Sequence, residues 1–313
     1  SGNTLQGIAI SDTNTSGNVI DGNYIGLDPT GAAAIANGWS GVDIFGGASG
    51  NFIGTTNVGV RNVISGNGNN GVSISGTGTS GNVVVGNYIG MNASGTVIVS
   101  NKWAGVSILG GAQSNQVGVP GHGNVISGNG NQGVAISGSG TKGNAVVANY
   151  LGVRPDGLAA PGNYWSGVAI FGGAQSNRFG GTTATERNII SGNRNRGIII
   201  ADVGTRGNVV SGNFIGPAPG GTSAFGNLWS GVNLFGGPDS NTIGGTAPGA
   251  GNVISGNLLQ GVLLQDAGTR SNWIQGNLIG LNAAGNAAMA NGYSGVEIYN
   301  GPVGNLVGGV GGR

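Results

Sequence analysis

The acidic and basic side chains with the clearest spacing lie in the C-terminal half of the chain. Asp202 and Asp266 are 64 residues apart, and each stands four residues before an arginine, Arg206 or Arg270. Two carboxylates about 5 to 10 Å apart can cleave a glycosidic bond, and a basic side chain can abstract or neutralise a proton. These four residues are therefore catalytic candidates for a polysaccharide lyase or glycoside hydrolase. The alternative is that they form solvated ion pairs on turns, which contribute little stability.

Aromatic side chains provide a second candidate site, because they recur once in every unit of about 64 residues. One row consists of Trp39, Trp103, Trp165, Trp229 and Tyr293, and the other of Phe45, Leu109, Phe171, Phe235 and Tyr299. Exposed rings can stack on the rings of an extended glycan, so these aromatic residues are candidates for carbohydrate binding. The alternative is packing beneath a short flap, because each longer repeat carries an inserted segment with Ile35, Val99, Pro161, Phe225 or Met289 in register.

Composition excludes several classes of function. Charged residues make up 7% of the chain and the net charge is +1, so binding to nucleic acid or to an acidic membrane surface is not expected. The chain has no cysteine, no apolar stretch long enough for membrane insertion, and one histidine, His122, which we interpret as a surface residue. No metal or other cofactor is predicted: isolated aspartates could bind Ca²⁺, but the calcium-binding nonapeptide is missing.

A repeated Gly-Val/Ile-x-Ile/Leu pattern organises the whole chain. It begins at Gly7, Gly41, Gly71, Gly105, Gly133, Gly167, Gly197, Gly231, Gly261 and Gly295. Most spacings alternate between 34 and 30 residues, with one of 28, so the unit is a pair of coils repeated five times. One asparagine series recurs at Asn18, Asn51, Asn82, Asn115, Asn144, Asn177, Asn208, Asn241, Asn272 and Asn305. A second recurs at Asn23, Asn62, Asn87, Asn124, Asn149, Asn188, Asn213, Asn252 and Asn277.

These patterns predict an all-β protein with three short strands in each coil. Alternation such as Val72 and Ile74 against Ser73 and Ser75 buries one face of a strand. Strands this short can pair with their equivalents one coil away, which gives three parallel sheets around an apolar axis. The predicted fold is a right-handed parallel β-helix of about ten coils, forming a single domain over residues 1–313. Asparagines at these turn positions can tolerate left-handed backbone angles, and their stacked side-chain amides can hydrogen-bond from coil to coil.

The phrases "GNVISGNGNNGVSISGTGTSGNVVVGNYIG" and "GGTAPGAGNVISGN" resemble the Asn/Gly-rich parallel β-helix repeats of bacterial secreted and cell-surface proteins, within the pectin-lyase-like superfamily. The resemblance covers essentially the whole chain. It implies an extracellular or cell-surface location, and it leaves function open, because the superfamily contains polysaccharide lyases, hydrolases and epimerases as well as stalks and adhesins. Neither end carries a distinct capping repeat, so we expect a fragment of a longer array or a subunit that joins neighbouring β-helix segments end to end.

The first functional hypothesis is a structural extracellular rod, such as a spacer, stalk or filament segment, because no unit is singled out by a dense polar cluster. The alternatives are a carbohydrate-binding surface on the aromatic rows and a polysaccharide-active enzyme. The outward positions of the first strand of each coil argue against the enzyme, since their two acids, Asp43 and Glu297, stand at opposite ends. Glycans are the expected partners under both alternatives.

Overall fold

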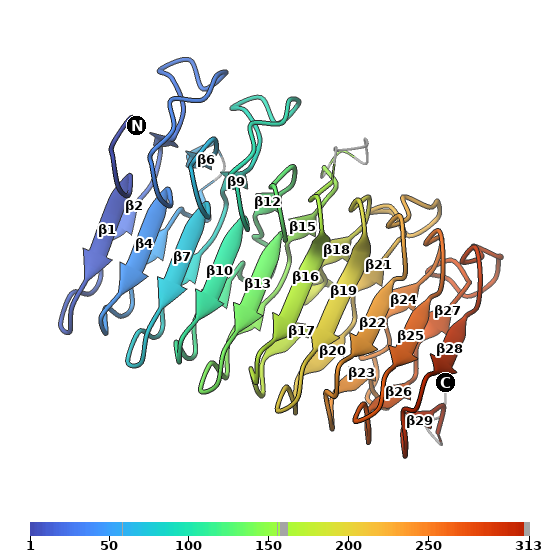
Figure 1. Cartoon of the computed structure of the whole chain (residues 1–313). Helices are drawn as coiled ribbons and strands as arrows, with labels where there is room; N and C mark the ends of the chain where they lie inside the picture. The colour runs from blue at the N-terminus through green and yellow to red at the C-terminus, as the bar shows by residue number, and fades with distance from the viewer. Residues whose placement is uncertain (58, 155, 157–161, 310–313) are drawn as a thin grey trace.

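The computed structural model describes residues 1–57, 59–154, 156 and 162–309. Each strand pairs in parallel with the equivalent strand of the next coil, as Ile8 pairs with Val42 in the first sheet. Three parallel sheets result, and they wind into a rod with the strands of the first sheet side by side in chain order (Figure 1). Nine coils contribute a strand to all three sheets, and a tenth contributes to two of them. The predicted parallel β-helix is confirmed.

Strands of the first sheet are four to six residues long, and those of the other sheets are two or three. The first sheet contains β1 (Ile8–Ser11), β4 (Val42–Phe45), β7 (Val72–Ser75), β10 (Val106–Leu109), β13 (Val134–Ser137), β16 (Ser166–Phe171), β19 (Arg196–Ala201), β22 (Val232–Phe235), β25 (Val262–Gln265) and β28 (Val296–Tyr299). The second contains β2 (Val19–Ile20), β5 (Phe52–Ile53), β8 (Val83–Val84), β11 (Gln116–Val117), β14 (Ala145–Val146), β17 (Arg178–Gly180), β20 (Val209–Ser211), β23 (Thr242–Gly244), β26 (Trp273–Gln275) and β29 (Leu306–Val307). The third contains β3 (Tyr24–Ile25), β6 (Val63–Ile64), β9 (Tyr88–Ile89), β12 (Val125–Ile126), β15 (Tyr150–Leu151), β18 (Ile189–Ile190), β21 (Phe214–Ile215), β24 (Val253–Ile254) and β27 (Leu278–Ile279).

One continuous core runs along the axis of the rod. Val72 and Ile74 of β7 are fully buried, as the alternation of the sequence predicts, and so is Ile89 of the third sheet. Most strands contribute one or two aliphatic side chains to the core cluster, whereas β17 contributes Phe179 and β29 contributes none. Equivalent side chains of neighbouring coils therefore stack on one another. This arrangement explains why every coil needs the same β-branched pattern.

Three ladders of asparagine side chains line the turns. The two series found in the sequence form two of them, with each side-chain amide donating to the side-chain oxygen one coil further on, as Asn82 does to Asn115 at 3.0 Å. The third ladder, at the turn that enters the first sheet, consists of Asn3, Asn37, Asn67, Asn101, Asn129, Asn163, Asn193, Asn227, Asn257 and Asn291. Most ladder asparagines are fully buried, so the ladders satisfy polar groups that water cannot reach.

The ladder asparagines do not adopt the left-handed backbone conformation that this residue type tolerates. Of the described asparagines, only Asn14 and Asn300 have positive φ angles, and neither belongs to a ladder. The residue before each asparagine of the second-sheet series takes that conformation instead: it is glycine in most coils, such as Gly81 with φ 66°, and serine in others, such as Ser114 with φ 55°. The strand-like backbone of the asparagine then aims its amide along the rod.

The inserted segments fold over the third sheet. Among the described residues, four of them are closed by an antiparallel bridge, such as the one between Leu27 and Ala34. At the tip of the first, the α-carbon of Gly31 lies against the ring of Tyr24, which projects outward from β3. Phe225 packs in the same way within a small cluster that includes Phe214. Pro161 of the third segment lies outside the described residues.

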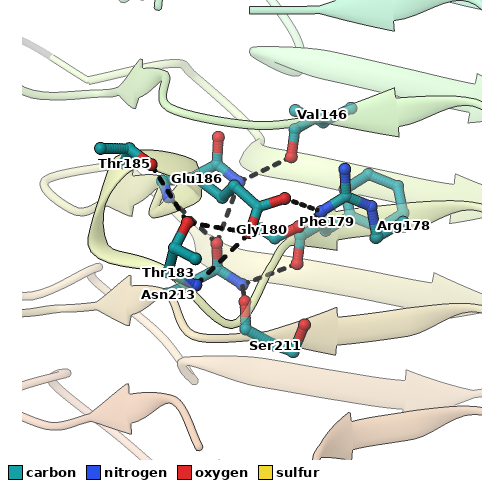
Figure 2. A network of polar contacts seen from close by, with 10 residues as sticks. Val146, Arg178, Phe179, Gly180, Thr183, Thr185, Glu186, Ser211 and Asn213 are labelled. Carbon is teal, nitrogen blue, oxygen red and sulfur yellow. Dashed lines mark hydrogen bonds and ion pairs between the residues drawn. The ribbon is translucent and has the colours of Figure 1, made fainter. Parts of the chain in front are cut away.

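The described part of the chain contains one helical element, the 3-10 turn η1 (Ala184–Glu186), between the second and third sheets. Glu186 fixes this turn, because its carboxylate accepts hydrogen bonds from Arg178 Nη1 at 2.7 Å and from Thr183 Oγ1 at 3.0 Å (Figure 2). No helix of the described residues is both long and apolar enough to span a membrane.

Candidate functional site

The aromatic rows lie on the outer face of the first sheet. Trp39, Trp103 and Trp229 stand three residues before a strand of the first sheet, and Trp165 stands directly before the longer strand β16. The residue of the second row ends the same strand, as Phe45 does in β4. The parallel register makes the rows straight: the main-chain N–H of Trp103 bonds to Asn69, and that of Asn69 bonds to Trp39. Equivalent rings are therefore two coils apart throughout.

Most of these rings are open to solvent. The exposed fractions are 52% for Trp39, 53% for Trp103, 43% for Trp165, 46% for Trp229 and 71% for Tyr293. In the second row, Phe45 and Tyr299 are exposed, whereas Leu109, Phe171 and Phe235 are half-buried. The inserted segments lie over the third sheet. They therefore do not form the flap over the rings of the first sheet that the packing alternative requires.

A groove of about 370 Å³ lies between the two rows near the N-terminal end of the rod. Trp39, Phe45 and Leu109 form its walls, and Asp43 and Ser73 lie on its floor. Asp43 is 5% exposed. Burial raises the pKa of its carboxyl above the usual value, and hydrogen bonds from Ser73 and Gln6 partly oppose that rise. The sequence identified Asp43 as outward-facing, but its burial depends on neighbours from adjacent coils.

The floor of the groove changes from one 64-residue unit to the next. The residues between successive ring pairs are Asp43, Ser107, Ala169, Asn233 and Glu297. In the fourth unit, the guanidinium of Arg196 stacks over Trp229 at 4.7 Å and over Phe235 at 5.8 Å. These two rings flank Asn233, which is fully buried and whose side-chain atoms have no hydrogen-bond partner in the described part of the chain. Arg196 therefore occupies this part of the groove itself.

The four catalytic candidates lie on a different edge, at the turns between the first and second sheets. Asp202 and Asp266 both have left-handed backbone, with φ angles of 75° and 73°. The carboxylate of Asp202 accepts a hydrogen bond from the main chain of Gly172 at 3.0 Å, and that of Asp266 from Asn300 at 2.9 Å. Both carboxylates therefore stabilise the turns by accepting hydrogen bonds from neighbouring coils.

Arg206 and Arg270 do stand in equivalent positions, but Asp239 occupies the same position in the coil between them. The ion pairs found among the described residues are Arg154 with Asp156 and Arg178 with Glu186, so neither arginine is paired with its candidate aspartate. The other basic residues of this half are spread over several faces: Arg187 stacks on Phe214, Arg194 on Tyr164 and Arg196 on Trp229. The structure does not gather them into one site.

No cluster of three or more histidine, cysteine, aspartate or glutamate side chains that could hold a metal ion occurs in the ranges described. No protein-family model matches the chain, and no curated protein is significantly similar to it. Two solved structures have similar folds. The shared feature is the parallel β-helix.

The first is the A-module of the mannuronan C-5 epimerase AlgE4 from Azotobacter vinelandii, with a TM-score of 0.49 and 15% identity over 96% of this chain and 83% of that one. The second is DFA-IIIase from Arthrobacter chlorophenolicus A6, solved in complex with GF2, with a TM-score of 0.40 and 14% identity over 91% of this chain and 60% of that one. The first is an epimerase by name. At this level of identity the similarity concerns the fold alone.

Proposed function

We propose that the outer face of the first sheet binds an extended, neutral polysaccharide without cleaving it. The observation that carries this proposal is the exposure of the tryptophan row: four equivalent indoles, from Trp39 to Trp229, each leave about half of their surface in solvent. Aromatic side chains at regular spacing and open to solvent are suited to stack on sugar rings. A single exposed ring is common on a protein surface, but a regular row of exposed rings is typical of an interaction surface.

The spacing of the rings supports a ligand that runs along the rod. Equivalent rings are two coils apart, or about 9.6 Å at roughly 4.8 Å for each parallel strand. That distance is comparable with the length of a disaccharide in an extended β-1,4-linked chain. Every second sugar of such a chain presents the same face, so successive indoles can meet equivalent sugar rings.

The floor between the rows favours a neutral ligand over an acidic one. Near the first two ring pairs it offers hydroxyl groups from Ser73 and Ser107 and the carboxyl group of Asp43, all of which can hydrogen-bond to sugar hydroxyls. The acids of the floor positions, Asp43 and Glu297, would repel a polyuronate. Arg196 is stacked between two rings and its Nε is buried, so its guanidinium is less accessible to an acidic ligand than one at the surface.

The placement of the acids supports binding without hydrolysis. Asp43 in β4 and Glu297 in β28 are eight coils apart in the first sheet, which is about 38 Å. Paired carboxylates in glycoside hydrolysis stand within about 10 Å of each other. A cleavage reaction on this face would therefore lack the second carboxylate.

The proposal is compatible with a structural rod, the second candidate function, because a rod can present a binding face along its length. The observation that favours the rod is the continuity of the core and of the three ladders through all coils. Under this proposal the rod acts outside the cell or at its surface, where extended glycans occur. Secretion of the protein by its native source, followed with an antibody, would test this location.

Affinity electrophoresis in gels that contain hydroxyethylcellulose, xylan or glucomannan tests the binding proposal. We expect at least one of these neutral glycans to retard the protein and the double variant W103A/W165A to bind about tenfold more weakly, since each ring contributes roughly 0.5 to 1.5 kcal/mol. The matched control is W273A, which removes an equally exposed indole, 52% in solvent, from the second sheet. Equal retardation of both variants, or none for the parent protein, would contradict the proposal.

A further inference from the structure

The repeat is broken once, in the coil that contains β10, β11 and β12. The first-sheet glycines of this coil and the next, Gly105 and Gly133, are 28 residues apart, where the equivalent coils span 30. The missing residues fall between the second and third sheets. Seven residues, 118–124, connect β11 to β12, whereas nine residues, 54–62, connect β5 to β6. His122, the one histidine of the chain, lies in this shortened loop.

The shortened loop leaves space over the third sheet. A hollow of about 460 Å³ lies between it and the loop before β6, with Arg61, Tyr88, His122 and Tyr150 among its lining residues. On the other side of the shortened loop the corresponding space is closed, because the main-chain N–H of Gly121 bonds to Thr185 at 2.7 Å in the next loop. That next loop is held by the Glu186 network of Figure 2.

Arg61 is the principal charge in the hollow. Its guanidinium stacks on the ring of Tyr88 at 4.2 Å, and neither ion pair found among the described residues involves it. Stacking of this kind leaves the edge of the guanidinium plane, with its N–H donors, free to bind a ligand. His122 is exposed on the opposite rim and can add a second donor.

The hollow continues along the third sheet in both directions. A second space of about 420 Å³ shares Arg61 and extends to Tyr24, and a third of about 140 Å³ shares Tyr88 and extends to Arg154. Tyr24, Tyr88 and Tyr150 are equivalent residues of successive units, recognisable in the sequence as the residue after the ladder asparagine in the phrase "NYIG" and its variant "NYLG". Arg154 is paired with Asp156, which lines the same space, whereas Arg61 takes part in neither ion pair found among the described residues. The hollow therefore combines a row of phenol rings with one arginine that is open to an anionic ligand.

We propose that this hollow binds a sugar residue that carries an anionic group. The ring of the sugar lies against Tyr88 and Tyr150, and its carboxylate or sulfate faces Arg61 and His122. Arginine suits either group, because its planar fork forms two parallel hydrogen bonds to a pair of oxygens. Thr55 and Asn57, on the adjacent wall, are positioned to hydrogen-bond to the sugar hydroxyls. This site is separate from the first-sheet face and does not depend on the neutral-glycan proposal.

Isothermal titration calorimetry with three oligosaccharides tests the site. Trigalacturonate supplies carboxylates, a sulfated κ-carrageenan tetrasaccharide supplies sulfates, and cellotetraose supplies neither. We expect one or both anionic probes to bind the parent protein, and R61Q to weaken that binding about tenfold, as for a lost hydrogen bond to a charged group. H122Q should weaken it less. Added salt should also weaken it, because the site is open to solvent.

The matched control is R206Q, which removes the same charge from the turns between the other two sheets and should leave the affinity unchanged. W103A/W165A should also leave it unchanged, because that variant alters the first-sheet face alone. The proposal is overturned if no anionic probe binds, if R61Q weakens the binding of cellotetraose as much as that of the anionic probes, or if R61Q matches R206Q. Loss of anion binding in W103A/W165A but not in R61Q would place the anion on the first sheet and would equally contradict this site. Thermal unfolding of each variant checks that R61Q remains folded.

Discussion

Asn144 donates a hydrogen bond from its side-chain amide to the side-chain oxygen of Asn177, 33 residues further along the chain, at 3.0 Å. The same amide donates to the carbonyl of Ala112, and the oxygen of Asn144 accepts from the side chain and the main chain of Asn115. The side chain of Asn144 thus makes four hydrogen bonds while the residue is fully buried. Because each asparagine is both donor and acceptor along the rod, a ladder joins all coils that carry it.

Replacement of one inner asparagine should therefore be costly. We expect N144A to lower the free energy of unfolding by about 3 kcal/mol or more, since it leaves several buried groups without partners. Urea unfolding followed by circular dichroism measures this loss. N18A is the matched control in the same ladder, because Asn18 is exposed and bonds to one neighbouring asparagine. Equal losses in the two variants would mean that burial of the amide does not determine its contribution.

The turn before this ladder offers a test of backbone strain. Ser114 has a φ of 55°, and the equivalent Gly81 has a φ of 66°. A β-carbon at Gly81 would meet its nearest neighbour at 3.7 Å, so the space is sufficient and the conformation alone matters. We expect G81S to destabilise the protein by about 1 kcal/mol and S114G to stabilise it slightly. Shifts of the same sign in both variants would contradict this account.

The sequence predicts the fold well because the β-helix repeats every structural requirement in each coil. The inward ladder of Val72 and Ile74, the paired strands and two asparagine ladders all appear as fixed spacings. The third ladder follows the same spacings, but its members, such as Asn37 and Asn67, do not precede an alternating apolar run. The third ladder is therefore periodic in the sequence, but it lacks the flanking apolar pattern that identifies the other two.

The binding surfaces depend on contacts that spacing does not reveal. Both the first and the third sheet carry outward aromatic residues, and the sequence does not say which sheet an inserted segment will cover. The structure places the segment around Gly31 over Tyr24, which leaves Trp39 open. His122 is a surface residue, as the sequence predicts, and the shortened loop around it is what distinguishes this position from the other coils. The deviation in repeat length at this loop is the feature of the sequence that indicates a local difference in structure.

Glu186 should make the stability of the loop around η1 depend on pH. Its partial burial acts to raise the pKa of the carboxyl, but hydrogen bonds from Arg178 and Thr183 and the charge of Arg178 outweigh that effect and lower it. A lowered pKa in the folded state contributes stability at pH values above the unfolded value of 4.5, and that contribution is lost as the pH falls through the folded pKa.

We therefore expect E186Q to lower the melting temperature by about 2 °C at pH 7, which corresponds to less than about 1 kcal/mol because Arg178 is partly exposed. The difference from the parent protein should shrink on acidification to pH 3. R178Q should give a similar loss, and the double variant should add little to either single change if the two side chains act as a pair. Full additivity at pH 7, measured by calorimetry, would contradict the pairing.

Asp43 should show the opposite dependence on pH. Burial on the floor of the groove raises the pKa of its carboxyl, so the folded protein holds this proton more tightly than the unfolded chain does. The stability from a raised pKa is fully present below the unfolded value of 3.8 and is lost as the pH rises through the folded pKa. At neutral pH the ionised carboxylate therefore costs stability, although Ser73 and Gln6 reduce that cost.

Asparagine keeps the hydrogen bonds without the charge, so D43N should melt about 2 °C higher than the parent protein at pH 7 and at nearly the same temperature at pH 3. Melting curves of the two proteins across this range decide the matter, because an advantage of D43N that stays constant with pH cannot arise from ionisation of Asp43.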